Sequence, residues 1–83
     1  MDELLQRLEL AEKAIITVKN KVARRDLLKM VKAVDRAMVA ADQESVECRR
    51  ARRETPRYRE LVQQARDLIT NLEQHITFAN LLG

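Results

Sequence analysis

The sequence has 83 residues, of which 46% are hydrophobic and 35% charged, and its formal net charge is +3. A single cysteine excludes an intramolecular disulfide framework and a single histidine excludes a multi-histidine metal site, while one glycine and one proline disfavour short strands joined by tight turns. No run of ~18 apolar residues is present, and the N-terminal sequence MDELLQRLEL is acidic and amphipathic, unlike a signal peptide. The composition predicts a helical, cytoplasmic protein.

The first predicted helix covers residues 2–20. Its apolar residues follow one another at alternating steps of four and three, which places them on one helical face: Leu4, Leu8, Ala11, Ile15, Val18 and Val22. The charged side chains between them fall on the opposite face.

The second predicted helix covers residues 27–52 and repeats this spacing with Leu27, Val31, Val34, Met38, Ala41, Ser45 and Cys48. The two apolar series are out of step by two residues, a rotation of about 200°, which favours a break near residues 20–26. Asn20 is expected to end the first helix in a left-handed conformation, and Asp26 is expected to cap the second. Since no glycine or proline enforces this break, one continuous helix over residues 1–53 is the alternative.

The third predicted helix covers residues 56–82. Thr55 is expected to cap it, with Pro56 at the first helical position, where a missing N–H costs nothing. Its apolar series consists of Tyr58, Leu61, Ala65, Leu68 and Leu72, flanked by Val62, Ile69 and Ile76. Leu68 and Val34, which lie midway along their helices, are expected to be deeply buried.

Three amphipathic segments with short joints predict one all-α domain over residues 1–83, an antiparallel three-helix bundle. The alternative is a long helical hairpin that forms an oligomeric coiled coil, in which the helix over residues 1–53 pairs between chains.

Candidate catalytic residues are few. His75 has Asn71 and Ala79 as its helical neighbours, which supply neither a carboxylate nor a nucleophile, and it is expected to be partly buried at the edge of the apolar series. Cys48 adjoins arginines that would stabilise a thiolate, yet it lies on the apolar face. Glu44 and Cys48 supply too few ligands for zinc. The sequence therefore predicts no enzyme, no cofactor and no metal.

Residues 49–59, RRARRETPRYR, form the densest charged segment, with six arginines against Glu54: Arg49, Arg50, Arg52, Arg53, Arg57 and Arg59. Guanidinium groups suit bidentate contacts with carboxylates and phosphates. We expect this cluster to bind a protein partner with an acidic surface. The alternatives are nucleic acid, which usually also needs aromatic or base-reading side chains, and anionic lipid headgroups.

The last turns of the third helix form the second candidate surface. This helix is longer than the first, so its end is expected to extend beyond its neighbours and expose apolar residues: Ile76, Phe78, Leu81 and Leu82. We expect them to contact an apolar helix of a partner or a second copy of the chain, so a homo-oligomer is one expected state.

One series of residues spans the second and third predicted helices: Leu27-Leu28 at a helix start, Asp42, Glu47 and Arg49 near its end, the Pro56-Arg57-Tyr58 junction, and Leu61, Leu68 and Leu72 in the next helix. In these features residues 27–76 resemble part of the N-terminal three-helix (Habc-type) regulatory domain of SNARE proteins, in particular Vti1-like and syntaxin-6-like Q-SNAREs. The family's fusion-driving coiled-coil motif and membrane anchor do not occur in this sequence. The resemblance implies a regulatory or adaptor domain in vesicle trafficking, peripheral to membranes, that binds other proteins.

Overall fold

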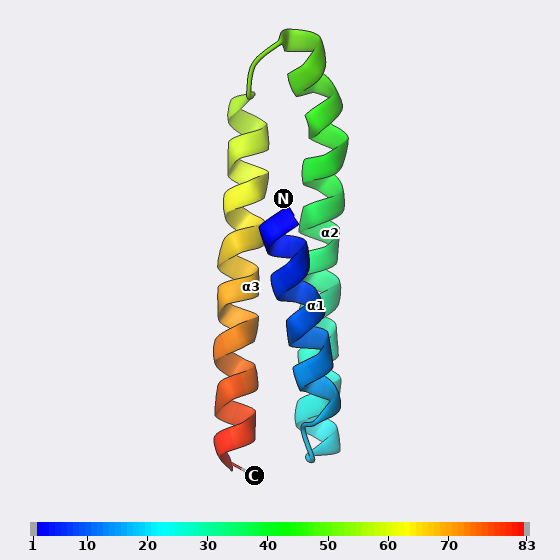
Figure 1. The fold of residues 1–83 in the computed structure, drawn as a ribbon, viewed down its shortest axis with the longest axis vertical. Coiled ribbons are helices and arrows are strands. Elements are labelled where there is room, and N and C mark those ends of the chain that lie inside the picture. The colour runs from blue at the N-terminus through cyan, green and yellow to red at the C-terminus, as the bar shows by residue number, and fades with distance from the viewer. Residues whose placement is uncertain (1, 83) are drawn as a thin grey trace.

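The computed structural model describes residues 2–82 and contains three helices: α1 (Asp2–Ile16), α2 (Lys21–Ala51) and α3 (Pro56–Leu82). Consecutive helices run antiparallel, and Figure 1 shows α1 lying against the hairpin that α2 and α3 form. The Cα atoms form a rod of 49 × 16 × 14 Å. The antiparallel three-helix bundle expected from the apolar spacing is confirmed. Within the described residues, no helix is long and apolar enough to cross a membrane.

A short connection at residues 17–20 separates α1 from α2, so the alternative of one helix over residues 1–53 is wrong. The expected role of Asn20 is also wrong. Its backbone is extended (φ −74°, ψ 117°), and its Oδ1 accepts hydrogen bonds from the backbone N–H groups of Val22 and Ala23, at 2.9 and 3.1 Å. Asn20 therefore caps the start of α2 at Lys21, and Asp26 lies inside the helix instead of at its cap.

The core is entirely aliphatic and runs along the bundle axis. Its largest fully buried side chains are Ile15, Val34, Ile69 and Leu72. Val34 is buried as expected, whereas Leu68 is only partly buried and Ile69 takes the central place in α3. Adjacent residues differ by about 100° around a helix, so the rotation of α3 about its axis decides which of the two faces the core. Val22, the last member of the first apolar series, is exposed because the chain has already turned into α2.

The helices differ in length, and α1 covers only part of the hairpin. Its 15 residues extend about 22 Å, whereas the 31 residues of α2 extend about 46 Å. Figure 1 shows the N terminus of α1 partway along the hairpin, and the connection from α1 to α2 at the same end as the C terminus of α3. The uncovered part is therefore the end with the α2–α3 connection. The expectation that the C-terminal turns of α3 outrun their neighbours is wrong.

One ion pair joins α1 to α3. Arg7 donates two hydrogen bonds to the Glu73 carboxylate, from Nε to Oε2 at 3.1 Å and from Nη2 to Oε1 at 2.5 Å. Its Nη2 also donates to Thr70 Oγ1, at 3.2 Å. The hydrogen bonds to Glu73 raise the pKa of the Arg7 guanidinium above its usual value. Because both side chains remain partly exposed, this pair contributes little to the stability of the fold.

The neighbours Leu68 and Ile69 provide a matched test of this packing. We expect Ile69→Ala to lower the free energy of unfolding by about 2–5 kcal/mol, because its side chain is fully buried and its removal leaves a cavity. Leu68→Ala should cost clearly less, because the half-buried side chain already contacts water. Urea denaturation of both variants measures the difference. Equal losses, or a larger loss for Leu68→Ala, would contradict the observed rotation of α3.

Candidate functional site

The end of α2 forms a tight turn that presents arginines. Arg52 has a left-handed backbone conformation, with φ 56° and ψ 34°. Its N–H donates to the carbonyl of Arg49 at 3.3 Å, and the N–H of Arg53 donates to the carbonyl of Cys48 at 3.1 Å. This pair of hydrogen bonds is the Schellman arrangement, in which glycine usually occupies the left-handed position. The chain therefore leaves the helix in a defined direction.

Thr55 joins the two helices at this end. Its hydroxyl donates a hydrogen bond to Glu44 Oε1 at 3.0 Å and accepts one from the backbone N–H of Tyr58 at 3.1 Å. The second bond is the expected N-cap of α3, which is confirmed. The backbone N–H of Thr55 donates a hydrogen bond to Cys48 Sγ at 3.5 Å. Close by, Arg57 Nε lies 3.8 Å from Glu44 Oε2. These polar contacts hold the connection at residues 52–55 against α2.

The structure brings six of the predicted site residues together around this connection, and all six are exposed: Arg49, Arg50, Arg52, Arg53, Arg57 and Arg59. We call this group the arginine tip. Arg50 pairs with Glu47 and Arg59 with Glu54, each at 3.4 Å between exposed side chains. Within residues 2–82, the guanidinium groups of Arg49, Arg52 and Arg53 make no hydrogen bond or ion pair, so their donors face solvent. The tip therefore keeps free bidentate donors on a fixed turn.

The other predicted site residues lie at the opposite end, in the last turns of α3. Phe78, Leu81 and Leu82 are exposed, as expected. Ile76 is instead part of the core, because it continues the buried face of α3 and packs against the region that α1 covers. Ile76 is therefore not available to a partner.

The residues considered for catalysis lie far from one another. Cys48 is partly buried, with its sulfur 3.7 Å from the hydroxyl of Thr55. His75 is exposed, not partly buried as expected, and its Nδ1 lies 2.8 Å from the backbone carbonyl of Asn71. Within residues 2–82, no three side chains of the His, Cys, Asp and Glu types lie close enough to hold one metal ion.

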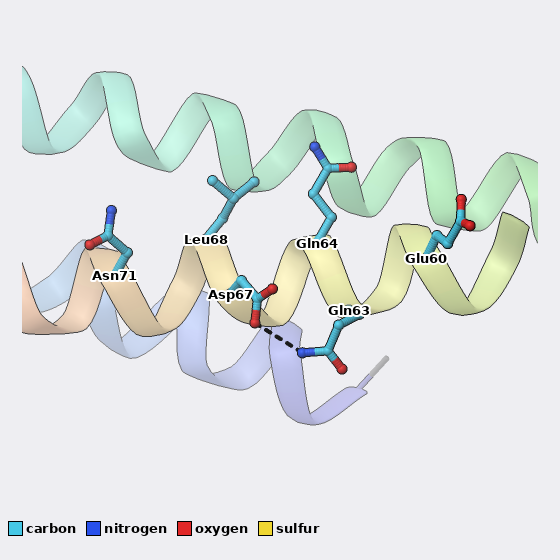
Figure 2. A pocket seen from close by; sticks show the side chains of 6 residues that line it. All are labelled: Glu60, Gln63, Gln64, Asp67, Leu68 and Asn71. Carbon is cyan, nitrogen blue, oxygen red and sulfur yellow. Dashed lines mark hydrogen bonds between the residues drawn. The ribbon is translucent and has the colours of Figure 1, made fainter.

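A shallow groove follows one side of α3, and Figure 2 shows the side chains that line it: Glu60, Gln63, Gln64, Asp67, Leu68 and Asn71. Gln63 donates a hydrogen bond to Asp67 at 2.9 Å. Leu68 is the one apolar residue among them. The lining includes no histidine, hydroxyl or thiol, so the groove offers hydrogen bonds and one apolar contact to a neighbour.

Sequence reasoning identified the arginines but missed the residues that hold them. Thr55 was expected only as a cap, and Glu44 only as half of an inadequate metal site. Their contact joins residues 11 positions apart and depends on how α2 and α3 align. The only signal in the sequence was a carboxylate four residues before Cys48, on the helical face that turns toward the junction.

No family model matches the chain, and neither the curated proteins nor the solved structures searched contain a match to it. The resemblance to SNARE regulatory domains therefore rests on the residues quoted above and stays a prediction.

The role of Thr55 can be tested by removing its hydroxyl. We expect Thr55→Ala to lower the free energy of unfolding by about 1–2 kcal/mol, because α3 loses its cap and Glu44 loses a hydrogen-bond donor. Thr17→Ala is the matched control, since its hydroxyl bonds only to a carbonyl three residues earlier, and it should change stability by about 0.5 kcal/mol or less. Thermal denaturation of both variants checks the prediction. A Thr55→Ala protein as stable as the control would contradict it.

Proposed function

We propose that this chain is a non-catalytic helical protein-interaction module that binds an acidic segment of a partner through the arginine tip. The observation that carries the proposal is the set of three unpaired guanidinium groups, Arg49, Arg52 and Arg53, on a turn that backbone and side-chain hydrogen bonds hold in place. A preorganised turn loses little conformational entropy when it binds.

The chemistry of the tip favours carboxylates. Arg57 and Arg59 already pair with the carboxylates of Glu44 and Glu54, which supports similar contacts with the acidic residues of a partner. Exposed ion pairs each contribute little, so affinity would come from several arginines acting together, and it would fall as salt rises.

A protein partner suits the tip better than a nucleic acid does. Tyr58 is the aromatic residue nearest the arginines, and it is partly buried and placed in the first turn of α3. A single half-buried ring gives bases little surface on which to stack. Binding to nucleic acid through the arginine tip is therefore the alternative, and the experiment below includes it.

The place of such a module in the cell is a further proposal. A regulatory or adaptor role in vesicle trafficking, in the cytoplasm beside membranes, is supported by the resemblance to SNARE regulatory domains. Whether the chain also self-associates into a scaffold is a separate property, which sedimentation measures directly.

The test uses a fluorescently labelled glutamate-rich peptide and measures its fluorescence anisotropy. We expect the triple variant Arg49→Gln, Arg52→Gln, Arg53→Gln to bind about 10-fold more weakly than the wild type, because three charge-assisted contacts are lost. The matched control is Lys29→Gln, Lys32→Gln, Arg36→Gln, which removes the same charge from exposed positions along α2 and should bind like the wild type.

Two results would contradict the proposal. Equal weakening in both triple variants would mean that peptide binding follows net charge and not the tip. Tighter binding of a single-stranded oligonucleotide than of the peptide, lost in the tip variant alone, would favour the nucleic-acid alternative.

A further inference from the structure

The end of the bundle opposite the arginine tip gathers the most exposed apolar side chains. Among the described residues, six large hydrophobic side chains are more than 60% exposed, and five of them lie here: Ile16 (74%), Val22 (63%), Phe78 (62%), Leu81 (79%) and Leu82 (75%). Figure 1 shows that the end of α1, the start of α2 and the end of α3 meet at this place. We call residues 16–25 and 76–82 the apolar end.

The apolar end is also positively charged. Residues 16–25 contain four basic side chains and no acidic one, namely Lys19, Lys21, Arg24 and Arg25, and residues 76–82 carry no charged side chain. Lys19 and Leu82 line the same shallow depression, so the charges border the apolar side chains directly. The nearest acids in the sequence, Asp26, Glu73 and Glu12, lie outside both segments, and Glu73 is paired with Arg7.

The shape of this end bears on what it can bind. The Cα atoms of the bundle span only 16 × 14 Å across the long axis, so the end is narrow. Its side chains also project from helix ends instead of lining a deep groove. Such a shape suits insertion into a fluid apolar medium.

A second copy of the chain is disfavoured by charge. End-to-end association would bring two apolar ends together, each with Lys19, Lys21, Arg24 and Arg25, and these like charges repel. A surface of opposite charge with an apolar interior removes this conflict. A bilayer that contains anionic lipids has both properties.

We propose that the apolar end binds the surface of anionic membranes. Phe78, Leu81 and Leu82 enter the boundary between headgroups and acyl chains, while the lysines and arginines of residues 19–25 contact lipid phosphates and carboxylates. Phe78 lies one helical turn before Leu82, about 6 Å along the axis, which is within the ~5–10 Å to which interfacial side chains sink. The arginine tip then projects away from the membrane, where it remains free for a protein partner.

Vesicle flotation tests the proposal with neutral phosphatidylcholine vesicles and with vesicles that contain phosphatidylserine. We expect the wild-type protein to float only with the anionic vesicles. Lys19→Gln, Lys21→Gln should lower its partition coefficient about 25-fold, since each basic residue near an anionic surface contributes roughly fivefold. Arg49→Gln, Arg53→Gln removes the same charge at the arginine tip and should leave binding unchanged.

Two matched triple variants test the contribution of the apolar side chains to membrane binding. Phe78→Ser, Leu81→Ser, Leu82→Ser should lower partitioning at least ~100-fold, because the side chains that enter the acyl boundary are lost. Leu10→Ser, Val39→Ser, Val46→Ser replaces exposed apolar residues elsewhere on the rod and should change it little. Circular dichroism confirms that each variant remains helical.

An insertion measurement keeps the proposal testable if any variant fails to fold. The chain contains no tryptophan, so Phe78→Trp introduces a single fluorophore at an exposed position. Its emission should shift to the blue with anionic vesicles and be quenched by brominated acyl chains, whereas Leu10→Trp should show neither effect. Absence of wild-type binding to anionic vesicles, or binding that only the tip variant loses, overturns the proposal.

Discussion

The bundle depends on the burial of one aliphatic series from each helix against a common axis. Ile15, Val34, Ile69 and Leu72 are shielded from water almost completely, and no aromatic ring takes part in this core. Most of the stability of a helix in a protein comes from packing of its apolar face, so each helix needs the apolar faces of its neighbours. In the part of the rod that α1 covers, all three helices bury their apolar faces against one another.

The part of the hairpin beyond α1 meets the requirement differently. Ala41 and Ala65 are the last fully buried residues toward the connection, and between residues 42 and 64 none is fully buried. Polar contacts replace the missing apolar burial, with Thr55 bonded to Glu44 and Cys48 near it. The polar contacts that support the arginine tip thus lie in the part of the hairpin that α1 does not cover.

The spacing of apolar residues was enough to predict three antiparallel helices, because each series repeats at helical steps over many turns. The spacing could not decide which of Leu68 and Ile69 is fully buried, since that depends on the rotation of α3 against both neighbouring helices. It also assigned Asn20 to the wrong helix, because asparagine occurs both at left-handed helix ends and at N-caps. The Thr55–Glu44 contact was beyond prediction, because it depends on the alignment of two helices across a turn.

The left-handed conformation of Arg52 also has a thermodynamic consequence. Such a conformation costs a residue with a Cβ atom about 1–2 kcal/mol, and glycine would adopt it without that strain. A glycine here would make the turn more stable but would remove one of the three unpaired guanidinium groups. At position 52 the arginine tip therefore gains a charge at the expense of fold stability. Selection for thermal stability and selection for binding would oppose each other at this position.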